Sequence, residues 1–84
     1  MQDILRQNIS DLENEILHIE ENMIEFLRMK YEEGIKKSLQ RLESDLKYLS
    51  ILANGAPIDK NEDRKIRDFL RTHYNKLQKL SVPA

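Results

Sequence analysis

The feature that most constrains this chain is a regularly spaced row of apolar residues near its N-terminus. Between residues 5 and 26 they recur at alternating gaps of four and three, the spacing of one narrow face of an α-helix. At 1.5 Å per residue this face is roughly 33 Å long, so the rest of the chain or a second chain is expected to cover it. We call this row the seam and predict it to be the interface with a protein partner or another copy. It consists of Leu5, Ile9, Leu12, Ile16, Ile19, Met23 and Phe26.

The composition favours a long-helix protein. Of the 84 residues, 35% are charged and 39% hydrophobic, and there are only two Gly and two Pro. That profile differs from a β-sandwich and from a disordered tail. Because cysteine is absent, disulfides, thiolate nucleophiles and thiolate metal sites are excluded. A chain of this length is expected to form one domain, residues 1–84, with a modest core.

The pattern of hydropathy also bears on location. No apolar stretch approaches the roughly 18 residues that span a bilayer. The segment from Met1 to Arg6 lacks the basic start and apolar run of a signal peptide. We therefore expect a soluble protein of the cytoplasm or nucleus, with no membrane partner.

The first helix is expected over about residues 3–31. Its second half carries a further apolar stripe beside the seam, so this part is expected to meet two neighbours. We call it the second stripe, and it consists of Leu17, Ile24, Leu27 and Tyr31.

The apolar phase then changes near Gly34. A new stripe, rotated by roughly 110° on a straight helix, predicts a second helix over about residues 35–53. Glycine is costly inside a helix, so we favour a kink or tight turn around residues 29–34 over one unbroken helix. The new stripe consists of Tyr31, Ile35, Leu39, Leu42, Leu46 and Leu49.

The second turn is expected over residues 53–59. Asn54 and Gly55 offer a left-handed helix cap, and Pro57 blocks continuation. Asp59 and Glu62 have the spacing of a capping box, which predicts a third helix over about residues 60–80. The fold class is thus all-α, a small bundle or hairpin of three helices. The stripe of the third helix consists of Ile66, Phe69, Leu70, His73, Leu77 and Leu80.

Signatures of catalysis are missing from the sequence. It has no Gly-rich phosphate loop, no Gly-x-Ser-x-Gly and no Cys/His pair, so we expect neither an enzyme nor a cofactor. His18 has Glu15 and Glu21 at helical spacing, but three ligands on one exposed helix make a loose metal site, and no metal is expected. His73 lies on an apolar stripe and is interpreted as a core histidine bonded to a neighbour.

Charge is unevenly distributed along the chain. Residues 1–33 carry nine acids against three bases, whereas residues 59–84 carry seven bases against four acids. The basic side chains of the third helix are candidate contacts to nucleic acid, but acids interrupt them. The alternative is that they pair with the acidic first helix or an acidic partner. The candidates are Arg64, Lys65, Arg67, Arg71, Lys76 and Lys79.

The third helix also resembles a known family. Ile66-Arg67-x-x-Leu70, followed by His73-Tyr74-Asn75-Lys76-Leu77-Gln78-Lys79-Leu80, is similar to the signature helix of GINS DNA replication complex subunits. The resemblance extends over roughly residues 31–80. It implies a non-enzymatic scaffold that assembles through helices and holds a replicative helicase. The small β-rich domain that GINS subunits carry has no counterpart in this sequence.

Three functions follow as hypotheses. The leading one is a helical scaffold or accessory subunit of a larger complex. In view of the resemblance, that complex is expected to be part of the DNA replication machinery. The second is a small DNA-binding domain that uses the basic third helix. The third is a self-associating coiled coil. Salt dependence separates the first two, because binding to DNA through Lys and Arg weakens steeply with salt and burial of apolar surface does not.

Overall fold

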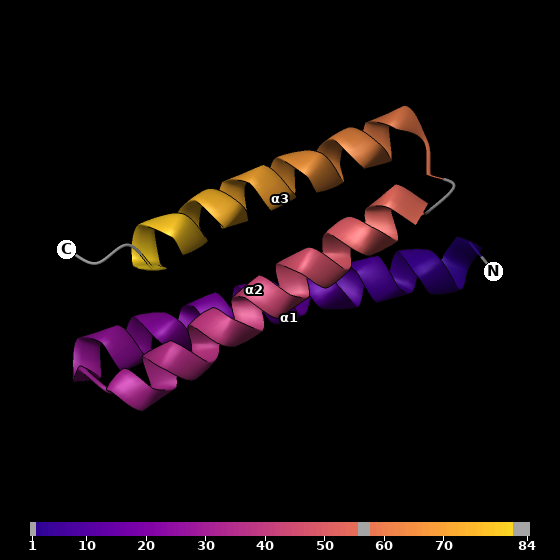
Figure 1. Ribbon diagram of the computed structural model, residues 1–84. Coiled ribbons are helices and arrows are strands. Elements are labelled where there is room, and N and C mark those ends of the chain that lie inside the picture. The colour runs from indigo at the N-terminus through magenta and orange to yellow at the C-terminus, as the bar shows by residue number, and fades with distance from the viewer. Residues whose placement is uncertain (1, 56–57, 82–84) are drawn as a thin grey trace.

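The chain folds into three antiparallel helices. The computed structural model describes residues 2–55 and 58–81, and these form α1 (Gln2–Met29), α2 (Glu32–Gly55) and α3 (Lys60–Ser81). Each helix runs back along the previous one, and the described part measures about 42 × 22 × 15 Å (Figure 1). The predicted all-α bundle of three helices is confirmed.

The first turn is a Schellman motif at the C-terminal end of α1. Lys30 adopts a left-handed φ of 56°. The Tyr31 N–H donates to the Phe26 carbonyl at 2.9 Å, and the Lys30 N–H donates to the Leu27 carbonyl at 3.2 Å. These two bonds satisfy carbonyls that the end of a helix leaves unpaired. The predicted break between the first two helices is therefore confirmed, and the backbone reverses at Lys30, not at Gly34.

Aromatic packing reinforces this turn. The rings of Phe26 and Tyr31 meet edge to face, with centroids 5.5 Å apart. The Tyr31 carbonyl then accepts the first hydrogen bond of α2, from the Ile35 N–H. Gly34 is helical and buried under both rings. The Tyr31 N–H thus caps the end of α1, and its carbonyl accepts the first hydrogen bond of α2. The chain reverses here without a Pro or a Gly at the turn.

The second turn leads into a capped α3. Asp59 Oδ1 accepts the Glu62 N–H at 2.8 Å, as the capping-box spacing predicts. At the other side of the turn α2 continues through Gly55, which has no positive φ, so the expected left-handed cap at Asn54–Gly55 is wrong. Pro57 lies outside the described residues.

The core is a single layer of apolar side chains shared by all three helices. α1 contributes four residues of the seam, α2 supplies three of the six residues of its predicted stripe together with Ala53, and α3 adds three aliphatic residues and the buried His73. Burial of this surface is the main stabilising contribution to the fold. The apolar core consists of Ile9, Ile16, Ile19, Met23, Leu42, Leu46, Leu49, Ala53, Ile66, Leu70 and Leu77.

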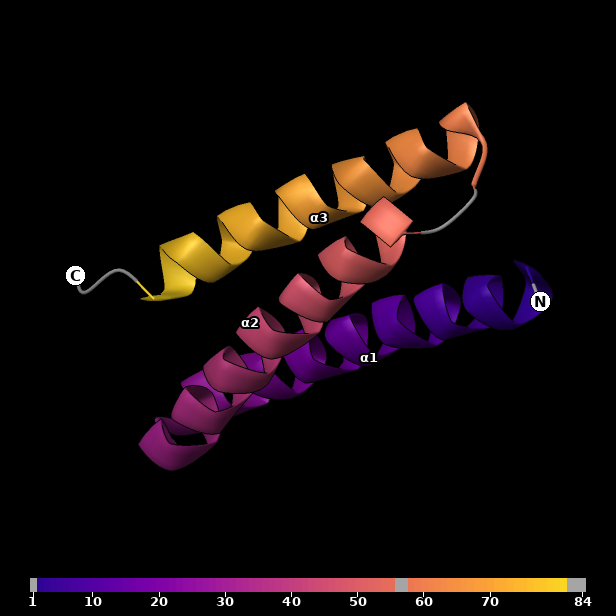
Figure 2. The ribbon, with the colours of Figure 1, turned by 45° about the vertical axis from the view of Figure 1, so that its right-hand side comes forward.

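α2 holds the other two helices together. It packs directly on α1 and on α3, whereas Cα atoms of α1 and α3 stay more than 8 Å apart throughout the described residues. Figure 2 shows α3 alongside α2, with its C-terminal end separated from the tip of the α1–α2 hairpin. The space between α1 and α3 is therefore bridged only by side chains.

No helix in residues 2–55 and 58–81 combines the length and the apolar character that crossing a membrane requires.

Candidate protein-docking groove

The seam lies inside the molecule. Ile9, Ile16, Ile19 and Met23 are buried against the chain's own α2 and α3. Leu5, Leu12 and Phe26 are half-buried, and the two leucines pack against the same core. The chain itself thus covers the seam in this structure, and a partner must use other surface.

The second stripe stays exposed instead. Leu17, Ile24 and Leu27 retain 42%, 57% and 43% of their surface, and Tyr31 is also exposed. We expected a second neighbour to cover this stripe, but within the described residues α3 only reaches its edge. A leucine-rich surface on the second half of α1 is left without a cover.

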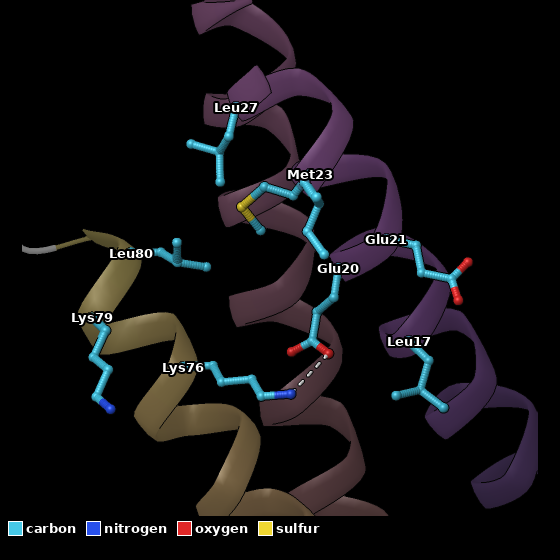
Figure 3. Close-up of a pocket in the computed structure, with 9 residues that line it drawn as sticks. Leu17, Glu20, Glu21, Met23, Leu27, Lys76, Lys79 and Leu80 are labelled. Atoms are coloured by element: carbon cyan, nitrogen blue, oxygen red, sulfur yellow. Dashed lines mark ion pairs between the residues drawn. The ribbon is translucent and has the colours of Figure 1, made fainter. Parts of the chain in front are cut away.

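Three residues of this stripe, Leu17, Ile24 and Leu27, form one wall of a groove between α1 and α3. The groove has a volume of about 530 Å³. Met23 is buried at its base, and the second wall is Leu80, which is 41% exposed although the sequence placed it on the buried stripe of α3. Figure 3 shows Leu80 pointing from α3 toward Leu27 and Met23. The residues that line the groove are Leu17, Glu20, Glu21, Met23, Ile24, Leu27, Lys76, Lys79 and Leu80.

A polar bridge closes one side of the groove. Glu20 Oε2 lies 2.7 Å from His73 Nδ1; the His73 side chain is buried and that of Glu20 is 14% exposed. Lys76 Nζ lies 4.0 Å from Glu20 Oε1, as the dashed line in Figure 3 shows. The Phe69 ring packs on the imidazole, with centroids 4.1 Å apart. The interpretation of His73 as a core histidine bonded to a neighbour is confirmed, and the bridge ties α3 to α1 where their backbones do not meet.

Further polar contacts join the two helices toward the N-terminal end of α1. Arg6 Nη2 lies 2.9 Å from Glu62 Oε1. Burial raises the pKa of Glu13, and the charge of the nearby His73 acts in the opposite direction. The acidic α1 and the basic α3 therefore already neutralise each other in part within the chain.

The candidate nucleic-acid contacts are all exposed on α3. Arg67 Nε lies 2.9 Å from Asp63 Oδ2, and Arg71 Nη2 lies 2.8 Å from Asp68 Oδ1. Lys76 takes part in the bridge to Glu20. Arg64, Lys65 and Lys79 complete the set. At 100° per residue these six positions spread over roughly half of the helix circumference, opposite the buried stripe.

The exposed His18 and its acidic neighbours are the other possible metal ligands on α1. His18 Nδ1 lies 3.9 Å from Glu21 Oε2, and both side chains are well exposed. In the described ranges no three His, Asp or Glu side chains are placed to share a metal ion.

No protein-family model, curated protein or solved structure matches this chain.

The apolar residues that line the groove could be identified from the sequence, but the fact that they stay exposed could not. The second stripe was visible as apolar residues beside the seam. What could not be read was that α3 would lie too far from α1 to cover it. That distance depends on how α3 packs against α2, which local periodicity does not determine.

Proposed function

We propose that this chain is a non-enzymatic helical docking module, a scaffold or accessory subunit that binds a helix of another polypeptide in the groove between α1 and α3. The observation that carries the proposal is the uncovered wall formed by Leu17, Ile24 and Leu27, facing Leu80 across the groove. Contiguous apolar surface with charged rims is typical of protein-interaction sites.

The dimensions of the groove suit a helical ligand. From Leu17 to Leu27 the wall covers ten residues of rise, about 15 Å or three helical turns. An amphipathic helix laid along it would present apolar residues at spacings of three, four and seven. A bound helix would extend the existing antiparallel arrangement by one member.

A place in the DNA replication machinery is the more specific form of this proposal. It rests on the resemblance of residues 31–80 to the helical part of GINS subunits. The α2–α3 pair that carries the resembling residues also positions Lys76, Lys79 and Leu80 at the groove.

The docking function is tested by affinity purification from the native source. The wild-type chain is compared with Ile24→Asp, and Ile51→Asp serves as the control because Ile51 is equally exposed but lies on α2, outside the groove. We expect proteins that co-purify with the wild type and with Ile51→Asp to be lost with Ile24→Asp. Equal recovery with all three, from folded protein, would contradict docking at the groove.

DNA binding by the outer face of α3 is the second candidate, and it is favoured by the exposure of all six basic residues. Three of them already pair with acids of the chain, which weakens the case. We therefore expect little duplex binding at physiological salt. Fluorescence anisotropy across a salt series measures it, because displacement of counterions makes such binding steeply salt-dependent. Tight binding that Arg67→Ala with Arg71→Ala abolishes would reverse the ranking.

A further inference from the structure

We propose that the helix which fills the groove is α1 of a second copy of this chain, so that two copies form a two-fold symmetric dimer. This inference rests on the proposed docking function and names its partner. In a two-fold dimer the same surface is used by both subunits, so the surface must be complementary to itself.

The apolar surfaces meet this requirement. The groove needs a helix with an exposed apolar stripe about three turns long. α1 has such a stripe in Leu17, Ile24 and Leu27, and it is the same stripe that forms the wall of the groove. On α2 the large exposed apolar residues are Tyr48 and Ile51, a shorter pair on one turn. When two α1 helices cross at this stripe, each covers the stripe of the other.

The charges are also self-complementary. One rim of the groove is acidic and belongs to α1, where the Glu21 side chain is 78% exposed. The opposite rim is basic and belongs to α3, where Lys79 is exposed. Figure 3 shows Glu21 on the side of α1 that points away from α3. An α1 helix that enters from a second copy brings its Glu21 toward Lys79, and the two-fold axis repeats this contact.

The charge of whole segments favours the same arrangement. Residues 1–33 carry an excess of six acids, and residues 59–84 carry an excess of three bases. An α1 from one copy that lies beside α3 of the other is attracted to it, and this attraction offsets the repulsion between the two acidic α1 helices where they cross. The arrangement also supplies the neighbour that the second stripe lacks within one chain.

Sedimentation equilibrium of the full chain, from low micromolar to millimolar concentration, tests the dimer. We expect a reversible monomer–dimer equilibrium for the wild type. Ile24→Asp should raise the dissociation constant by about 100-fold, since a charge then enters the centre of the interface. Ile51→Asp should leave it unchanged. Circular dichroism melts verify that both variants stay folded.

A charge exchange tests the orientation of the two copies. Glu21→Lys alone and Lys79→Glu alone should each weaken self-association by about tenfold, because each variant places like charges across both symmetric contacts. An equimolar mixture of the two variants should restore association, since both contacts then join opposite charges. The mixture is measured with one variant fluorescently labelled.

Three results would overturn the dimer. They are a wild type that remains monomeric at millimolar concentration, a dimer that Ile51→Asp breaks and Ile24→Asp does not, and a mixture no tighter than its components. If the chain is monomeric and Ile24→Asp still removes a co-purifying protein, the dimer fails while the docking function stands. If Ile24→Asp changes neither property in a folded chain, both fail.

Discussion

Gly34 shows how one missing side chain permits the join between α1 and α2. A Cβ at this position would lie 2.7 Å from Tyr31 Cδ2 and 2.9 Å from Phe26 Cγ. Contacts that short force both rings to move, and these rings form the apolar contact of the Schellman motif. From the sequence alone, a helical Gly34 would be expected to gain stability on change to Ala. The packing of the rings reverses that sign.

The two glycines of α2 provide a matched test. Gly34→Ala should destabilise the fold by about 1–3 kcal/mol through overpacking. Gly55→Ala should stabilise it by about 0.5–1 kcal/mol, since alanine favours helix and no described atom lies within 4 Å of the new Cβ. Chemical denaturation of both variants measures the difference. Gains of equal size at both positions would show that the rings move aside freely.

Asp45 is a residue whose ionisation opposes folding. Its Oδ2 is buried and, in the described part of the chain, has no hydrogen-bond partner. Burial and the neighbouring Glu15 raise the pKa of Asp45, while Arg41 acts to lower it. A folded-state pKa above the unfolded value means that this group stabilises the fold most when it is protonated. Its contribution is lost as the pH rises through the raised pKa.

Asp45→Asn should therefore be more stable than the wild type at neutral pH. The gain should shrink as the pH approaches the ordinary aspartate pKa of about 4, where the wild-type side chain is protonated too. Urea unfolding of both proteins across this pH range measures the difference. Glu43→Gln, at an exposed position of α2, controls for the loss of one negative charge. A gain that is constant with pH would exclude ionisation as its cause.

At the scale of the elements, the turn after α1 depends on a lysine in a conformation that suits glycine. Lys30 has a φ of 56°, which costs a residue with a Cβ roughly 1–2 kcal/mol. Lys30→Gly removes this strain but raises the conformational entropy of the unfolded chain, which opposes folding. We therefore expect the free energy of unfolding to rise by up to about 1 kcal/mol. Lys36→Gly, at an exposed helical position, should lose about 1 kcal/mol. Thermal melts compare them, and a loss at both positions would contradict the left-handed turn.

The element boundaries show what periodicity can predict. The expected helices over residues 3–31, 35–53 and 60–80 correspond to α1, α2 and α3, with the start of α3 as expected and differences of one to three residues at the other ends. The largest differences occur at the first turn, where the backbone reverses on Lys30 without a glycine or proline. That reversal is stabilised by the contact between Phe26 and Tyr31. Local sequence rules for turns do not predict such a contact.

At the scale of the whole molecule, α1 carries two apolar surfaces with different roles. The seam is buried by α2 and α3, and the second stripe borders the open groove. Sequence periodicity identified both surfaces but assigned the partner to the seam. The distance between α1 and α3 decides the assignment, and it follows from the packing of both helices on α2. Ile16 and Met23 therefore belong to the core, whereas Leu17 and Ile24, each one position further along the helix, do not.

The same substitution on each surface tests this division most directly. Ile16 is fully buried and Ile24 is more than half exposed. Ile16→Asp should abolish cooperative unfolding, because an unpaired charge in the core costs several kcal/mol, a large part of the stability of a small domain.

Ile24→Asp should instead unfold cooperatively, like the wild type at concentrations where the wild type is monomeric, and lose association at the groove. Urea unfolding followed by circular dichroism, with sedimentation of the same samples, measures both properties. A cooperative, wild-type transition for Ile16→Asp, or unfolding of Ile24→Asp to the same extent, would contradict the assignment of the seam to the core and the second stripe to docking.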